Sequence, residues 1–268
     1  MRKYAHVIAI GLQNTLVYRV NFLFRATFGL IPLLATILLW RAIYEGRTDP
    51  DGVAGYSLAQ MTTYYLVVSL VDMLTGVTDD DWQIAADIRD GAISQFLLKP
   101  LNYLVYRLCL YFSGRVIYTA FALLPVGLFI LFLRDYAVLP PSLAALGQFL
   151  IAVVLTGLLQ FLISFSMAML AFWVLEVSTF IFMLYAVEFL AGGHLFPLDI
   201  LPPALLELLF FTPFPYMLFF PVSIYLGRTT GADIWHGLAI QTLWVLAAAF
   251  LARLVWERGI KRYGAYGG

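Results

Sequence analysis

The chain has 268 residues, of which 62% are hydrophobic and only 12% are charged, whereas about 25% of the residues of a soluble domain are charged. A soluble protein of this size needs a polar surface and cannot bury so many apolar side chains, so the composition indicates a membrane protein. The formal net charge of zero gives no electrostatic basis for nucleic-acid binding, and the single Cys109 excludes an internal disulfide and a cysteine-based metal cluster.

The first expected element is an N-terminal helix at residues 1–20. The segment starts with basic residues and continues with apolar ones, as a signal peptide does. However, Gln13 and Asn14 interrupt the apolar part, and no small-x-small cleavage site follows. Because the apolar residues recur at helical spacing, we expect a helix in the membrane interface that is retained in the mature protein. A cleaved signal peptide is the alternative.

Six later stretches are apolar and long enough to cross the hydrocarbon core, which takes about 20 residues in a helix. They cover residues 22–44, 57–78, 108–133, 143–172, 177–196 and 234–256. The sequence therefore predicts an all-α polytopic membrane protein with six transmembrane helices. The whole chain, 1–268, is expected to form a single transmembrane domain.

A further apolar stretch covers roughly residues 204–226, and three prolines interrupt it: Pro213, Pro215 and Pro221. Interior prolines break helices. Basic residues favour the cytoplasmic side, and they gather at the N-terminus, in the 79–107 loop and at the C-terminus. An even number of spans places all three on one side. We therefore predict a re-entrant or interfacial helical hairpin on the outer side at 197–226, both termini in the cytoplasm, and a cytoplasmic tail at 257–268.

A short charged element at 79–100 lies between the second and third spans. Thr78 and Asp79 can cap a helix, Gly91 can end it, and Pro100 stops a second short piece. A compact amphipathic helix on the cytoplasmic side is suited to dock on another protein. The alternative is a re-entry turn that only lies on the membrane.

Three segments follow one another along the chain: I-R-D-G-A-I-S-x-x-L-L-K-P-L at 88–101, G-G-H-L-F-P-L-D-I-L-P at 192–202 and W-E-R-G-I-K-R-Y-G-A-Y-G-G at 256–268. Together with the N-terminal helix and the six spans, they resemble the membrane subunits of type-2 ABC (ATP-binding cassette) exporters, especially the small bacterial six-span permeases. The resemblance covers the whole chain. In such exporters the first cytoplasmic loop carries a coupling helix that sits in a cleft of the nucleotide-binding subunit. The resemblance thus implies a set of residues that couple to the ATPase: Asp81, Trp82, Asp87, Arg89, Asp90 and Gly91.

The ATPase is expected in a partner subunit. A P-loop needs G-x-x-x-x-G-K-[ST], and none of the three lysines, Lys3, Lys99 and Lys261, follows a glycine. We therefore expect no enzyme activity and no cofactor in this chain, with ATP and Mg bound by P-loop ATPase subunits. The resemblance also implies export, a second permease subunit that is identical or homologous, and a place among the lipids of the bacterial cytoplasmic (inner) membrane, with no nucleic-acid partner.

Ionisable residues inside spans are costly and usually face protein or water. Asp72 is a candidate cavity carboxylate that attracts cations or pairs with Arg115, and the alternative is a structural ion pair or an aspartate at the level of the membrane interface. Glu188 is either a pathway carboxylate or one satisfied by a neighbouring helix, and His194 is either a pH sensor or a plain hydrogen-bonded histidine. Aromatic side chains could line the same cavity or simply pack. The candidate pathway residues are Asp72, Glu188, His194, Tyr65 and Tyr185.

Two other functions remain open from the sequence. One is an intramembrane enzyme acting on lipid or cell-wall substrates, with Asp72, Glu188 and His194 converging in the fold. The other is an ion-coupled secondary transporter. Neither an H-E-x-x-H nor a G-x-S-x-G pattern occurs in the sequence.

Overall fold

Helices make up 80% of the computed structural model, which describes residues 2–46, 52–77 and 80–263. No β-strand occurs in these ranges, so the all-α prediction is confirmed. The longer helices are α1 (Arg2–Leu16), α2 (Arg19–Glu45), α3 (Leu58–Thr75), α6 (Tyr103–Phe132), α7 (Leu143–Ala168), α8 (Ser178–Ala191) and α12 (Ala232–Arg262). The shorter ones are α4 (Asp80–Arg89), α5 (Ile93–Leu97), η1 (Arg134–Tyr136), η2 (Met169–Phe172), η3 (Leu198–Ile200), α9 (Pro203–Phe210), α10 (Phe214–Met217) and α11 (Phe219–Tyr225).

Four helices in the described part of the chain are long and apolar enough to cross a membrane: α2, α6, α7 with its continuation η2, and α12. The predicted second and fifth spans are helical too, but α3 has 18 residues and α8 has 14. At 1.5 Å per residue, α8 rises about 21 Å, which is less than the roughly 30 Å of a hydrocarbon core. The six-span count therefore stays a prediction that depends on α3 and α8.

The interior of the bundle is formed by α3 and α7, on which α2, α11 and α12 pack. Every residue of α3 from Met61 to Val68 is buried. By contrast, α2, α6 and α12 expose many large apolar side chains, as helices in contact with lipid do. An interior helix such as α3 can carry polar side chains that its neighbours satisfy.

Buried polar contacts fasten the helices to one another. The side chain of Gln241 on α12 is fully buried, and its Nε2 donates to the carbonyl oxygens of Ala152 (3.0 Å) and Tyr216 (2.9 Å). The distance from Gln241 Nε2 to Thr156 Oγ1 is 3.1 Å. A single amide thus joins α12 to α7 and α10, which are 25 to 89 positions away in the sequence.

The first helix packs on α6. Lys3 Nζ donates to the carbonyl oxygen of Pro100, and the backbone N–H of Asn102 donates to the Tyr4 hydroxyl (3.2 Å). Further along, Ser113 Oγ donates to the carbonyl oxygen of Ile8 (3.3 Å). These contacts fix α1 beside the start of α6, while its location in the membrane interface stays a prediction.

The segment 197–226 is a chain of short helices in which the prolines begin helices. Pro213 precedes α10, Pro215 lies in the first turn of α10, and Pro221 is the third residue of α11. Proline is tolerated in a first turn because its missing N–H would have no intrahelical acceptor there. The segment packs on α7, α3 and α8. Its placement on the outer side of a membrane stays a prediction.

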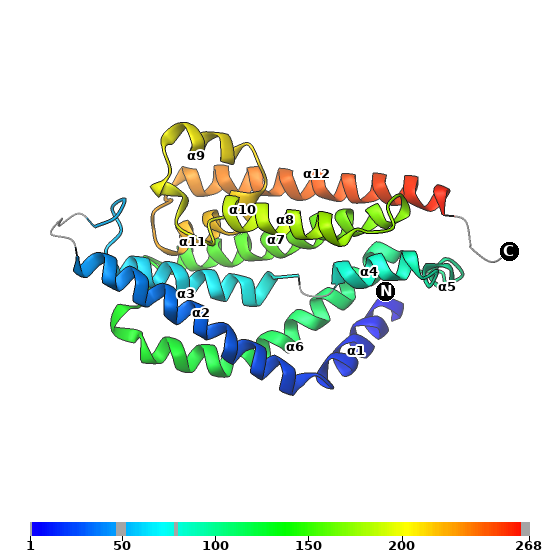
Figure 1. The fold of residues 1–268 in the computed structure, drawn as a ribbon, viewed down its shortest axis with the longest axis horizontal. Coiled ribbons are helices and arrows are strands. Elements are labelled where there is room, and N and C mark those ends of the chain that lie inside the picture. The colour runs from blue at the N-terminus through cyan, green and yellow to red at the C-terminus, as the bar shows by residue number, and fades with distance from the viewer. Residues whose placement is uncertain (1, 47–51, 78–79, 264–268) are drawn as a thin grey trace.

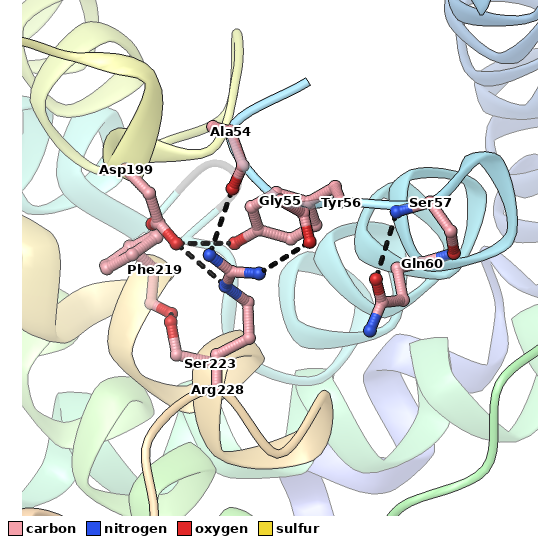
Figure 2. A network of polar contacts seen from close by, with 9 residues as sticks. All are labelled: Ala54, Gly55, Tyr56, Ser57, Gln60, Asp199, Phe219, Ser223 and Arg228. Atoms are coloured by element: carbon pink, nitrogen blue, oxygen red, sulfur yellow. Dashed lines mark hydrogen bonds and ion pairs between the residues drawn. The ribbon is translucent and has the colours of Figure 1, made fainter. Parts of the chain in front are cut away.

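A polar network joins this segment to the turn before α3 (Figure 2). Arg228 Nε donates to Asp199 Oδ2 (2.9 Å), and its two terminal nitrogens donate to the carbonyl oxygens of Gly55 and Ala54, both at 3.1 Å. The Tyr56 hydroxyl donates to the same Asp199 oxygen (3.0 Å), and burial raises the pKa of Tyr56, which keeps it a donor. The guanidinium also lies 4.0 Å from the centre of the Tyr56 ring.

The two ends of the bundle differ in the elements that they hold. The Arg2 end of α1 and the Arg262 end of α12 lie beside α4 and α5, whereas α9 and the turn before α3 lie at the opposite end (Figure 1). Both described ends of the chain thus share one end of the bundle, as an even number of crossings requires.

Replacing Gly237 by Ala tests the contact between α12 and α11. A Cβ at position 237 would lie 2.2 Å from Phe220 Cε2, and the Phe220 ring is buried against Tyr216, with ring centres 5.7 Å apart. We expect Gly237→Ala to lower the melting temperature in detergent, because overpacking a core costs about 1–3 kcal/mol. The control is Gly127→Ala on α6, where no atom lies within 4 Å of an added Cβ. Equal melting temperatures for both variants would contradict the close packing of α12 on α11.

Candidate functional site

The charged element at 79–100 forms two short helices, α4 and α5, at one end of the bundle. Thr78 and Asp79, the predicted caps, lie outside the described residues. One face of α4 is apolar and buried: Ile84 and Ile88 pack with Phe165 and Met169 against α7 and η2. The element is therefore part of the helical bundle and not a loose loop on its surface.

Asp81 joins α4 to α8. Its side chain is 1% exposed, and the Tyr185 hydroxyl donates to one of its carboxylate oxygens. The other oxygen accepts from the backbone N–H of Trp82 (2.8 Å) in the first turn of the helix. A buried carboxylate needs such partners because its desolvation is costly. Of the predicted coupling residues, Asp81 thus faces inward and has a structural contact.

Asp87 joins α4 to α6 in a similar way. The Tyr103 hydroxyl donates to Asp87 Oδ2 (2.8 Å), and the same oxygen lies 3.6 Å from Arg107 Nη1. The Tyr103 ring stacks on Trp256 of α12, with ring centres 5.2 Å apart and planes 13° apart. Asp87 is therefore held by α6, and the end of α12 supports this contact from the other side.

Gly91 ends α4, as predicted, with a φ of +79° that favours glycine. Its carbonyl oxygen accepts from Ser94 Oγ (2.7 Å) and from the hydroxyl of Tyr263 (3.1 Å), just after α12. This turn directs the chain from α4 into α5. The hydrogen bond from Tyr263 also holds the end of α12 against the element at 79–100.

The other three predicted coupling residues point away from the bundle. Trp82 is 43% exposed. The Arg89 and Asp90 side chains, which pair with each other at 3.1 Å, are 54% and 61% exposed. Beside Trp82 and Arg89, a groove of about 320 Å³ separates α4 from the start of α8. We call the exposed residues Trp82, Arg89 and Asp90 the outer face of α4.

A cavity of about 420 Å³ lies deeper, among α2, α3, α6, α7 and α8. Four of the five predicted pathway residues line it: Asp72, Tyr185, Glu188 and His194. The fifth, Tyr65, is not among its lining residues; its hydroxyl donates to the carbonyl oxygen of Leu195 (2.8 Å) and accepts from Trp40 Nε1 (2.8 Å). Tyr65 thus holds α3 against the chain that follows α8.

The polar groups of this cavity contact one another. His194 Nε2 lies 3.1 Å from Asp72 Oδ1, and Gln160 Nε2 donates to Glu188 Oε1 (3.0 Å). Asp72 thus contacts His194, while Arg115, the partner considered from the sequence, lines the same cavity. The His194 ring stacks on Phe189, with centres 5.4 Å apart. His194 is placed there because α8 ends at Ala191 and Gly193, at a φ of +96°, turns the chain back toward α3.

Gln160 is a site residue that the sequence analysis missed. It is buried on α7, where its side chain links the central helix to Glu188. Its signal in the sequence is an amide in the middle of the apolar run 143–172, and such a group needs a partner inside the bundle. The resulting cavity offers two carboxylates, an imidazole, an amide and two guanidinium groups to a polar or charged ligand. The described residues contain no group of three or more His, Cys, Asp and Glu side chains that could hold a metal ion.

Comparison with protein families gives a match over most of the chain. The family model described as "ABC-2 family transporter protein" matches residues 30–267, a range that contains the outer face of α4 and all the pathway candidates. The comparison with curated proteins finds no match.

A double-mutant cycle tests the Asp72–His194 contact. We expect Asp72→Asn and His194→Gln each to lower thermal stability in detergent, and the two changes together to cost less than their sum. The coupling energy of groups in contact is about 0.5–3 kcal/mol. The control cycle uses Arg253 and Glu257, an exposed ion pair on α12, for which we expect no measurable coupling because water and salt screen it. Additive effects at Asp72 and His194 would show that the two side chains do not interact.

Proposed function

Because the chain belongs to the ABC-2 family of transporter proteins, we propose that it is the permease subunit of an ATP-driven exporter. Family membership makes it a membrane protein and a permease component of an ABC transporter, a component that is not itself the ATPase and associates with ATPase subunits. The proposal goes further in two respects. It assigns coupling to ATP hydrolysis to the element at 79–100, and it gives transport an outward direction.

The outer face of α4 is the observation that carries the proposal. A docking helix must be fixed to its own subunit on one side and free on the other. The side of α4 that holds Asp81 and Asp87 is fastened to α8 and α6, while Trp82, Arg89 and Asp90 are exposed. Aromatic and arginine side chains of this kind are enriched at protein interfaces. We propose that this face docks in a cleft of the ATPase.

The buried contacts of α4 provide a route from the docking face to the cavity. Tyr185, which donates to Asp81, is one helical turn from Glu188 on α8. Residues Tyr185 and Glu188 both line the cavity. A displacement of α4 would therefore move α8 and the cavity wall together. On this basis we propose that Asp72, Tyr185, Glu188 and His194 belong to the substrate pathway and that Asp81 is a positioning residue.

The surroundings of the permease are also proposed. The start of α1, the end of α12 and the helices α4 and α5 share one end of the bundle (Figure 1). These parts of the sequence are rich in Lys and Arg, so we place that end in the cytoplasm of a bacterial cell and the protein in its inner membrane. The segment 197–226, tied to α3 by the Arg228 network, would then lie on the outer side and close the cavity from that side. A second permease subunit, identical or homologous, completes the transmembrane unit, and ATP and Mg bind to the ATPase.

An intramembrane enzyme is the second candidate function. The contact between Asp72 and His194 at 3.1 Å, with Glu188 in the same cavity, is the convergence that such an enzyme needs. An ion-coupled transporter would use the same groups. Both alternatives differ from the exporter because neither requires an ATPase on the outer face of α4.

Removing the charges of the outer face tests the docking proposal. We expect the double variant Arg89→Ala, Asp90→Ala to fold normally, because both side chains are exposed. It should lose retention of the ATPase during purification by at least about tenfold, since interface arginines often contribute more than 1.4 kcal/mol to binding. The measurement is quantitative mass spectrometry of subunits that co-purify in mild detergent.

The matched control is the double variant Arg134→Ala, Asp135→Ala. These residues form the same adjacent Arg–Asp pair, exposed by 79% and 85%, in a different loop. We expect the control to retain the ATPase. Equal retention by both double variants would remove the docking proposal, and an ATPase absent from the unmodified protein, even after crosslinking in membranes, would favour the two alternatives.

Replacing Tyr185 by Phe tests whether the contact between α4 and α8 transmits movement from the ATPase to the cavity, separately from whether the ATPase docks. The variant removes the hydroxyl that donates to Asp81 and leaves the ring in place. We expect the ATPase to remain bound while ATP-driven transport falls by about tenfold, because the loss of one hydrogen bond to a charged group costs about 1.5–3 kcal/mol. The control is Tyr136→Phe, at an exposed tyrosine outside the cavity. Transport by Tyr185→Phe at the unmodified rate would exclude this route.

A further inference from the structure

A second and larger cavity lies between the helices α1 and α2 and the element at 79–100, which we call the coupling element from here on. Its volume is about 840 Å³, and residues of α1, α2, α4, α5 and α6 line it. It shares Arg25, Arg115 and Tyr118 with the cavity that contains Asp72 and Glu188, so the two cavities adjoin. The function proposed above does not use this second cavity.

Positive charge dominates the described lining of this cavity. Four cationic side chains line it, namely Arg25, Lys99, Arg107 and Arg115, against one carboxylate, Asp87. That carboxylate already accepts from Tyr103 and lies 3.6 Å from Arg107. The amides of Asn14, Asn21 and Gln83 add further donors to the wall. The cavity therefore has many more donors than acceptors and suits an anion.

Arg25 and Lys99 are the cations that are most available to a ligand. Arg25 is exposed and makes no hydrogen bond or ion pair with any residue in the described part of the chain. Lys99 is exposed too, and its ammonium lies 4.9 Å from the centre of the Phe96 ring. Because Arg25 lies on α2 and Lys99 follows α5, a ligand bound to both would bridge the first long helix and the coupling element.

The rest of the wall is apolar, which identifies the kind of anion. Val7 and Ile10 of α1 and Phe22 of α2 line the cavity. Next to them, the outer surface of α2 exposes Val20 by 54% and Phe24 by 58%. A free phosphate would gain nothing from such a surface, whereas acyl chains would continue along it. Basic pockets between transmembrane helices near the membrane surface are known binding sites for anionic headgroups.

We propose that this cavity binds the phosphate headgroup of an anionic phospholipid, with Arg25 and Lys99 as its main ligands. Arginine and lysine both form strong charge-assisted hydrogen bonds to phosphate. The inference goes beyond the proposed export function and does not depend on it, because it concerns binding of a lipid by the permease alone.

Native mass spectrometry of the full chain, purified in detergent and titrated with phosphatidylglycerol or phosphatidylcholine, tests the proposal. We expect phosphatidylglycerol to bind more tightly than phosphatidylcholine. The double variant Arg25→Gln, Lys99→Gln should bind phosphatidylglycerol at least about tenfold more weakly, because it loses two hydrogen bonds to a charged group. Arg25→Lys, which keeps the charge, should retain most of the binding, and the melting temperature of each variant verifies that it folds.

The matched control is the double variant Arg19→Gln, Lys261→Gln. It removes the same two kinds of charge from exposed positions that do not line the cavity. We expect its lipid binding to equal that of the unmodified chain. Equal loss in both double variants would show an effect of net charge only, and full binding by the Arg25, Lys99 variant would exclude the site. Displacement of phosphatidylglycerol by inorganic phosphate would show a site for free anions and overturn the assignment to a lipid.

Discussion

Polar groups inside an apolar bundle must find their partners within the protein, and this requirement organises the structure. Water is not available at the centre of a membrane, so an unpaired donor or acceptor there costs several kcal/mol. The buried hydroxyl of Tyr64 donates to the carbonyl oxygen of Gly193 (2.6 Å), 129 positions away in the sequence. Gln241 binds carbonyl groups of α7 and α10 in the same way. These few directional contacts set which helices lie together, whereas apolar packing alone would leave many arrangements nearly equal in energy.

The same requirement divides the coupling element into two sets of residues. Asp81 and Asp87 are acidic and were expected at the partner interface, yet they are held by hydroxyl groups of α8 and α6. Their role in the proposed mechanism is to connect α4 to the bundle. Trp82, Arg89 and Asp90 remain for the partner. A helix that is anchored by the buried carboxylate of Asp81 can transmit a displacement, because this anchoring contact is not exchanged for water when the helix moves.

Much of the fold could be predicted from the sequence, because long apolar runs determine long helices. The end of α4 at Gly91 also followed from local rules. Which side of α4 is buried could not be predicted from the sequence. Acidic residues occur on both of its sides, and only the tertiary partners decide which of them are buried. Gln160 was missed for a similar reason: one amide in an apolar helix has no local signature of its partner, Glu188. Pro213, Pro215 and Pro221 predicted breaks in the helix, and the segment is a chain of short helices in which each of these prolines lies where a new helix starts.

The two adjoining cavities share two cations, and this sharing has an energetic reason. Carboxylates such as Asp72 and Glu188 are costly inside a bundle unless positive charge lies near them, and cations such as Arg115 are costly without negative charge. Arg25 and Arg115 line both cavities, so each site supplies part of the counter-charge of the other. A phosphate bound among the cations would weaken the positive field that reaches the carboxylates, because interactions between charges are strong in a medium of low dielectric constant. The proposed lipid site and the proposed pathway are therefore coupled through Arg25 and Arg115, and a change of lipid would alter the electrostatic field in the transport cavity without any direct contact.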